Sequence, residues 1–285
     1  QGYMNVTILV DNTALFDRMF TAEHGFSAYI EASGNRILFD TGYSGAFLEN
    51  AGKMGIDLLD LDYIVISHGH FDHTGGLWHL VRRFLEAGIE EAPHRLPRLI
   101  AHPRCFLPRP KPPLPDIGAL LGAEEIQRIL PVDLSAAPVR IARDVFFLGE
   151  IERKFPFEDT DPGPRQIILP GGDLQKDRIV DDTGLAFRTR DGLVVLTGCA
   201  HAGICNTVEH ARKLCGDDRV LDIISGLHLR AADARLEKTL AYLKGVRPAA
   251  LHACHCTSLP AKIALAQGTP LQETGVGLRL EYADR

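Results

Sequence analysis

The sequence predicts an α/β fold built from layers of strands and helices. Short runs rich in β-branched residues alternate with segments of helical periodicity in both halves of the chain, and this alternation favours a layered α/β domain. Several of the strand-like runs end in a glycine-containing turn that carries a histidine. With 45% hydrophobic and 24% charged residues over 285 positions, the composition is that of an ordinary globular protein with a large core.

The N-terminal third follows this alternation. Apolar runs rich in valine, isoleucine and phenylalanine predict strands over residues 6–10, 26–30, 36–39, 63–66 and 98–101. Helical segments are expected over residues 45–54 and 77–87, and each of them stops near a glycine.

The second half begins with a short helix and two strands, over residues 139–141 and 145–148, inside the segment 119–173. The runs 183–189 and 193–197 predict a hairpin across Arg190-Asp191-Gly192. Helices over 204–214, 232–245 and 261–266 then alternate with strands over 220–225, 249–251 and 277–281. We expect one domain over residues 4–285, and we interpret residues 1–3, which precede Met4, as a tag remnant.

Composition and charge exclude several classes of protein. The net charge of −6 argues against a nucleic-acid-binding protein, since such proteins need a basic surface. No apolar stretch is long enough to span a membrane. The six cysteines lack the spacing of a disulfide framework, so we expect a cytoplasmic protein and treat Cys254 and Cys256 as packing residues.

The motif with the clearest chemistry is the run Ser67-His68-Gly69-His70-Phe71-Asp72-His73-Thr74-Gly75-Gly76, which follows a strand-like segment. Side chains alternate along a strand, so His68 and His70 point the same way. Asp72 and His73 then fall in a turn and the first helical residues. Imidazole nitrogens and carboxylate oxygens suit zinc, iron or manganese, so this run predicts a metal site.

Further histidines follow later strand-like runs. His201, His228 and His255 each come after an apolar run and a turn, and ligands from several strand ends can converge at one edge of a sheet. His252 points to the opposite strand face from His255 and is left out of the site. His24 either lines the pocket or belongs to a loop cap with Glu23. His79, on the helix after the motif, is expected to be a surface or packing residue.

A proline-rich segment at about residues 93–118 holds eight of the seventeen prolines within 93–115. Beyond Ala101 it is too rich in proline to form a central strand or helix. It is either a solvated loop or a cap whose cations, Arg104, Arg109 and Lys111, meet an anionic substrate.

Together these motifs resemble the metallo-β-lactamase superfamily. The similarity extends to its dihydropteroate-synthase-like branch, named for a synthase that makes 7,8-dihydropterin-6-ylmethyl-4-(β-D-ribofuranosyl)aminobenzene 5'-phosphate. The segments that carry it are Glu23-His24-Gly25-Phe26-Ser27, Leu38-Phe39-Asp40-Thr41-Gly42, the run from Ser67 to Leu77, Gly198-Cys199-Ala200-His201-Ala202-Gly203-Ile204 and Cys254-His255-Cys256-Thr257.

The resemblance implies a four-layer αββα sandwich with two divalent metal ions at one edge, zinc first and iron or manganese as alternatives. It implies two ligand sets: His68, His70 and His201 for the first metal, and Asp72, His73 and His255 for the second. Asp40 would orient a ligand imidazole. Most binuclear members carry a bridging aspartate, and the strand end that we match to it holds Gly226-Leu227-His228 instead. We therefore expect His228 in the site, as a ligand or proton donor.

Three functions compete. The resemblance implies a transferase in which an arylamine nitrogen attacks a pterin methylene while diphosphate leaves. A metallohydrolase of a phosphoester, ester or thioester needs the same metals, since metal-bound water reaches a pKa of ~7, and Asp72 would orient the nucleophile. The third hypothesis is a non-catalytic metal-binding protein. The expected partner of either enzyme is a small anionic or phosphorylated substrate, with no nucleic acid and no membrane; the sequence leaves the oligomeric state open.

Overall fold

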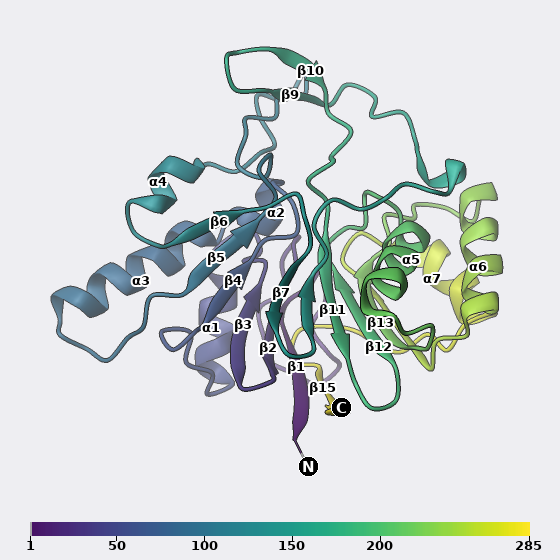
Figure 1. Cartoon of the computed structure of the whole chain (residues 1–285), viewed down its shortest axis with the longest axis horizontal. Coiled ribbons are helices and arrows are strands. Elements are labelled where there is room, and N and C mark those ends of the chain that lie inside the picture. The colour runs from purple at the N-terminus through teal and green to yellow at the C-terminus, as the bar shows by residue number, and fades with distance from the viewer. Residues whose placement is uncertain (1) are drawn as a thin grey trace.

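The computed structural model describes residues 2–285 and consists of two β-sheets packed face to face, with helices on both outer sides (Figure 1). One sheet has seven strands in the order β15-β1-β2-β3-β4-β5-β6, and the other has six in the order β14-β13-β12-β11-β8-β7. The expected four-layer αββα sandwich is confirmed.

The seven-stranded sheet is antiparallel from β15 to β3 and parallel from β3 to β6. Three helices accompany it: α1 (Ala46–Lys53), α3 (Leu77–Ile89) and α4 (Ala123–Gln127). Their apolar faces pack on the outer side of the sheet, because leucines and phenylalanines recur there at helical spacing. The strands are β1 (Tyr3–Val10), β2 (Ser27–Ala32), β3 (Asn35–Phe39), β4 (Tyr63–Val65), β5 (Arg98–Ala101), β6 (Val132–Leu134) and β15 (Arg279–Ala283).

The six-stranded sheet is parallel from β14 to β12 and antiparallel from β12 to β7. Helices α5 (Ile204–Cys215), α6 (Ala234–Val246) and α7 (Leu259–Ala266) cover its outer face. Its strands are β7 (Val139–Ala142), β8 (Val145–Phe147), β11 (Gly184–Arg188), β12 (Leu193–Thr197), β13 (Val220–Gly226) and β14 (Ala250–Cys254).

The inner faces of the two sheets share a core of fully buried side chains. Phe26 and Phe39 of the first sheet lie in the same cluster as Phe147 and Phe187 of the second. Each buried phenylalanine contributes about 1.5–3 kcal/mol relative to an exposed one. This core fixes the two sheets relative to each other, and so fixes the edge at which their strand ends meet.

The sequence patterns missed three short strands. β6 has three residues, and the hairpin of β9 (Gln166–Ile168) and β10 (Leu174–Lys176) is largely polar, so neither carries a periodic signal. A 3-10 turn over Pro156–Glu158 was also missed. Excluding Tyr3 from the fold was wrong, because Tyr3 pairs with Ala283 in the sheet; Gln1 lies outside the described residues.

The proline-rich segment and the β9–β10 hairpin project together from one end of the sandwich (Figure 1). The Gln166 amide donates to the Pro110 carbonyl at 2.9 Å, and the Ile168 amide donates to the Pro108 carbonyl at 3.0 Å. Two segments far apart in the sequence therefore form one structure above the strand ends. Within residues 2–285, no helix has the length and apolar character needed to cross a membrane.

Candidate metal centre

The first donors come from the loop after β4 and from the short helix α2 (Phe71–Thr74). Nε2 of His68 lies 3.0 Å from Nδ1 of His70, and both side chains are buried. The loop turns tightly here: a Cβ on Gly69 would lie 1.8 Å from the Cys105 carbonyl oxygen, so only glycine fits. α2 then places Asp72 and His73 beside this pair.

The second sheet supplies its donors one at a time. His201, His228 and His255 follow β12, β13 and β14, which are neighbouring parallel strands. The His201 ring centroid lies 4.8 Å from that of His68, and the His255 centroid lies 5.0 Å from that of His73. The structure thus brings together all six residues that we expected to bind metal.

Two groups of donors can be distinguished. The first contains His68, His70 and His201, and Nε2 of both His70 and His201 is buried without a hydrogen-bond partner. In the second, Nε2 of His255 lies 3.2 Å from Nε2 of His73 and 3.3 Å from Oδ2 of Asp72. Each group therefore gathers three side chains of the types that hold divalent cations.

These distances fit metal ions. Ligand bonds of about 2.0–2.1 Å in a tetrahedral site place neighbouring donor atoms about 3.3 Å apart. Nε2 of His70 and Nε2 of His201 are buried without a hydrogen-bond partner, and a buried polar atom without a partner is costly. A cation between the donors removes that cost, so the residues present fit a bound metal in each group.

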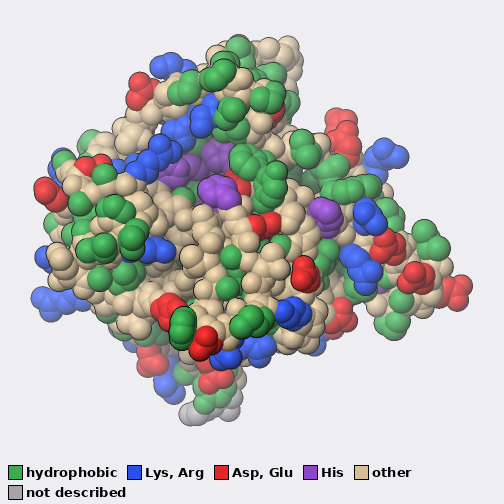
Figure 2. Space-filling model, turned by 180° about the vertical axis from the view of Figure 1, so that it is seen from behind, with side chains coloured by type: hydrophobic (Ala, Val, Ile, Leu, Met, Phe, Trp, Pro, Cys, Tyr) green, Lys and Arg blue, Asp and Glu red, His purple; other side chains and the backbone are tan. Residues whose placement is uncertain are grey.

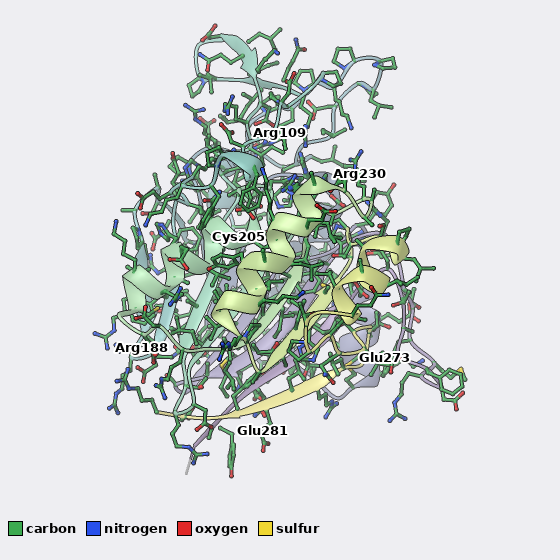
Figure 3. The ribbon with its side chains drawn as sticks, turned by 90° about the vertical axis from the view of Figure 1, so that its right-hand side faces the viewer. Arg109, Arg188, Cys205, Arg230, Glu273 and Glu281 are labelled. Atoms are coloured by element: carbon green, nitrogen blue, oxygen red, sulfur yellow. The ribbon has the colours of Figure 1, made fainter. Side chains whose placement is uncertain are left out.

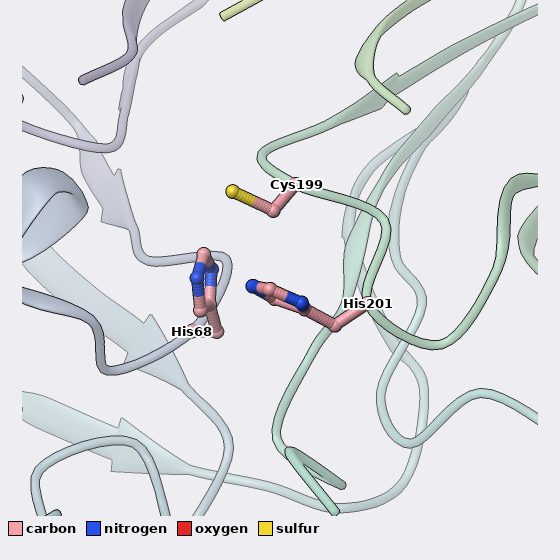
Figure 4. Close-up of side chains that lie close together, drawn as sticks. All are labelled: His68, Cys199 and His201. Atoms are coloured by element: carbon pink, nitrogen blue, oxygen red, sulfur yellow. The ribbon is translucent and has the colours of Figure 1, made fainter. Parts of the chain in front are cut away.

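Cys199 is a further donor that we did not expect from the sequence. Its Sγ lies 3.2 Å from Nε2 of His73. It also lies within 4.8 Å of donor atoms of His68 and His201, toward which it points in Figure 4. A donor atom of His255 lies within 4.8 Å of it as well. Cys199 therefore lies between the two groups. From the sequence we had looked for a residue between the metals at the turn 226–228, where other members carry a bridging aspartate. The only sequence signal was its place two residues before His201.

Asp40 orients one of these donors, as expected. Its Oδ2 lies 2.6 Å from Nδ1 of His73, and the Ser67 amide and hydroxyl donate to the same carboxylate at 2.7 and 2.6 Å. Burial favours neutral His73, but the Asp72 and Asp40 carboxylates outweigh it and raise the pKa of His73 to about 9. A Cβ on Gly198 would lie 2.3 Å from Ser67 Oγ, so glycine is required behind this network.

The backbone at this edge adopts the left-handed conformation at four non-glycine residues. The φ angles are +56° at Asp40, +50° at Ala200, +49° at His228 and +45° at His255. Such residues cost on the order of 1–3 kcal/mol each and persist where the surrounding structure holds them. Their concentration around the donors is typical of a functional site.

His228 and His24 lie at the rim. The His228 ring centroid is 4.5 Å from that of His201. Burial, followed by the positive charges of Arg230 and Arg165, lowers the pKa of His228 to about 4. Nε2 of His24 lies 3.0 Å from Oδ2 of Asp72, so His24 lines the pocket.

The neighbouring Glu23 caps a loop by accepting the Tyr43 and Ser44 amides. The two alternatives that we left open for the Glu23-His24 pair therefore both hold, one for each residue.

His252 is held away from the centre, as expected. Its Nδ1 lies 2.8 Å from Oδ1 of Asp222, and the Tyr282 hydroxyl donates to the other oxygen of Asp222 at 2.6 Å. All three side chains are buried. This satisfied cluster also explains why Asp222 is no bridging ligand.

The structure corrects the expectation for Arg109. This side chain is fully buried and forms ion pairs with Asp177 and Asp181, the latter at 2.6 Å. It holds the proline-rich segment to the residues after β10 and cannot meet a substrate. Lys111 of the same segment does face the cavity.

Four of the six donors, His70, Asp72, His201 and His255, line a cavity of about 430 Å³, and His68 and His73 are fully buried beside them. The proline-rich segment contributes part of its wall through Lys111, Leu114 and Ile117. Figure 2 shows histidine side chains in a hollow with lysine and arginine side chains beside them. A cavity of this volume accommodates a small molecule.

Comparisons with known proteins identify the family of this chain. The profile of the metallo-beta-lactamase superfamily matches residues 20–212. The chain belongs to this superfamily. It is 32% identical over 276 residues to the 7,8-dihydropterin-6-methyl-4-(beta-D-ribofuranosyl)-aminobenzene-5'-phosphate synthase of Methanocaldococcus jannaschii, covering 91% of this chain and 89% of that protein. It therefore belongs to the branch that includes this synthase, and it is an enzyme of the superfamily.

Solved structures agree. One described as a metal-dependent hydrolase of the beta-lactamase superfamily superposes with a TM-score of 0.82 at 28% identity, covering 99% of this chain and 100% of that one. A diphosphatase of the PhnP family superposes with a TM-score of 0.56 at 16% identity, covering 98% and 97% of the two chains, and shows the shared fold.

Proposed function

We propose that this enzyme binds two divalent metal ions and acts on a small phosphorylated substrate, as a synthase of the dihydropterin type. The observation that carries this proposal is the pair of donor groups on either side of Cys199. Nitrogens of His68 and His70 lie 3.0 Å apart beside His201, and the donor atoms of Asp72, His73 and His255 lie 3.2–3.8 Å apart. The similarity to the Methanocaldococcus jannaschii synthase over nearly the whole chain supports it.

In this proposal His68, His70 and His201 hold the first ion, zinc or alternatively iron or manganese. Asp72, His73 and His255 hold the second, and the Cys199 thiol faces both. Divalent cations supply charge neutralisation for a leaving diphosphate and lower the pKa of water. Asp40 keeps Nδ1 of His73 occupied, which leaves Nε2 to face His255 and Cys199.

His228 is the proposed hydrogen-bond donor to the substrate at the rim. Its pKa of about 4 keeps the imidazole neutral at pH 7. A neutral imidazole offers one N–H group, so His228 can donate a hydrogen bond to an anionic oxygen without carrying the charge of an imidazolium.

Transfer requires two substrates. The arylamine nitrogen forms a bond to the pterin methylene carbon, the carbon–oxygen bond to diphosphate breaks, and the nitrogen loses one proton. A hydrolysis is the second candidate, because the neighbour with a TM-score of 0.82 is described as a metal-dependent hydrolase. It uses the same donors with water as the attacking group.

Parallel assays of the metal-loaded protein test the proposal. Diphosphate release is measured with the pterin diphosphate alone, with the arylamine phosphate alone and with both. The synthase predicts release that requires the arylamine and yields the coupled product. Release without the arylamine, or phosphate release from the phosphoester, would favour the hydrolase, and no turnover of any of them would contradict both.

A further inference from the structure

Three arginines surround the mouth of the cavity, and none of them has a carboxylate partner. Arg165 directly precedes β9, Arg230 follows β13 and His228, and Arg235 lies in the first turn of α6. Most other arginines near this edge are paired; Arg109, for example, contacts Asp177 and Asp181. Within residues 2–285, no ion pair within 4.0 Å joins Arg165, Arg230 or Arg235 to an acidic group.

The three side chains face a common space. Arg165, His201 and His228 line both the 430 Å³ cavity and a second, narrower cavity beside it. Arg230 lines the first of these and Arg235 lines the second. The shared residues therefore mark a junction between the two cavities, next to the first group of metal donors. All three arginines lie close enough to His228 for their charges to lower its pKa.

The nearby carboxyl groups are already engaged. Asp177, which lines the narrower cavity, pairs with Arg109. Glu158 is buried and accepts the Cys205 and Asn206 amides at the start of α5, at 2.9 and 2.8 Å. Neither of them forms an ion pair with the three arginines, so the positive charge at the junction is not neutralised from within this part of the chain.

Partly buried cations without a carboxylate partner are unfavourable, and this applies to Arg165 and Arg235, whereas Arg230 is exposed. Nε of Arg165 donates to the Pro162 carbonyl at 2.9 Å. Burial and the charge of Arg230 lower the pKa of Arg165 although Asp177 acts the other way. The Nε atom of Arg235 is buried without any hydrogen-bond partner. An arginine keeps its charge under these conditions, so the remaining way to satisfy such a group is an external anion.

We propose that Arg165, Arg230 and Arg235 form a phosphate-binding subsite that takes the phosphomonoester group of the substrate while the reacting part of the substrate lies over the metal donors. Guanidinium groups bind phosphate oxygens through paired N–H donors, which provides both affinity and orientation. This inference rests on the proposed function, because it names the part of the substrate that the cavity mouth recognises. Arg109, which the sequence suggested for this role, is instead buried between two carboxylates.

The test is the affinity of inorganic phosphate for the metal-loaded protein, measured by titration calorimetry. The variants are Arg235→Met and Arg165→Met. The matched control is Arg188→Met, because Arg188 is half-buried, pairs with Asp144 and lies at the opposite end of the sandwich from Arg230 (Figure 3). Metal content and melting temperature are recorded for every protein.

We expect Arg235→Met and Arg165→Met each to raise the dissociation constant of phosphate about tenfold or more, as loss of a charge-assisted hydrogen bond of about 1.5 kcal/mol or more implies. Arg188→Met leaves it unchanged, and Arg235→Lys restores part of the affinity. If all of these variants keep their full metal content, the loss of phosphate affinity is due to the arginines and supports the subsite.

Equal phosphate affinity in the wild type, Arg235→Met and Arg165→Met would show that the metals alone hold the anion and would overturn the subsite. Absence of phosphate binding in the wild type would overturn it as well. Both results leave the proposed reaction standing if turnover is observed. Conversely, arginine-dependent binding in a protein without turnover would retain the subsite and reject the reaction.

Discussion

Two buried histidine clusters in this molecule differ in how their polar atoms are satisfied. Between the sheets, His252, Asp222 and Tyr282 form a closed set in which each side chain has a partner at 2.6–2.8 Å. At the sheet edge, His68 faces His70 and His73 faces His255, nitrogen to nitrogen. The first cluster is satisfied by its own side chains, whereas the second contains two buried nitrogens without a partner, Nε2 of His70 and Nε2 of His201, and fits bound cations.

The same contrast separates the arginines. Arg109 is buried between two carboxylates, but Arg235 is half-buried and forms no ion pair with any acidic group of residues 2–285. Residue type alone does not distinguish a structural group from a ligand-binding one. The distinction lies in whether the surrounding chain already supplies the partners.

The largest effect is expected from His68→Ala, which removes a donor from the unsatisfied cluster. Metal content should fall by about one ion per chain, and turnover should fall by well over roughly 100-fold, more than the loss of an outer hydrogen bond to a ligand costs. Elemental analysis and the release assay measure the two quantities. Unchanged metal content would contradict the assignment of His68 as a metal ligand.

Arg109→Met tests a charged side chain whose partners are supplied by the chain itself. The change leaves Asp177 and Asp181 buried without their cation, so the free energy of unfolding should fall by about 3–5 kcal/mol. Chemical denaturation measures it. The folded fraction should keep its metals and its phosphate affinity. A stable variant with weakened phosphate binding would restore Arg109 to the substrate site.

Cys199→Ser asks whether the thiol between the two groups is a ligand. In cobalt-substituted wild-type protein a thiolate ligand gives a near-ultraviolet charge-transfer band, and the serine variant should lack it. We also expect about tenfold weaker binding of one metal, since a soft thiolate is replaced by a hydroxyl. An identical spectrum in both proteins would make Cys199 a packing residue.

The smallest effect is expected from His252→Gln, the control within the closed cluster. Glutamine retains a donor for Asp222, so stability should fall by only about 1 kcal/mol, the contribution of one neutral hydrogen bond. Metal content and turnover should stay at the wild-type values. A loss of metal here would remove the contrast between the two clusters.

Much of this arrangement could be predicted from the sequence, because the strands are apolar and the histidines follow them directly. His68 to His73 form a local motif, and strand order brings His201 and His255 to the same edge. Cys199 could not be identified, since a cysteine in an apolar context gives no sign of its neighbours. The roles of Arg109 and Arg235 were equally hidden, because ion pairing depends on Asp177 and Asp181, which lie about 70 positions along the chain from Arg109.

The most direct test is anomalous X-ray scattering from crystals of the metal-loaded protein. Two peaks are predicted, one among His68, His70 and His201 and the other among Asp72, His73 and His255, with the Cys199 sulfur between them. Fully loaded crystals with no peak at these residues, or with metal bound only elsewhere, would contradict the account.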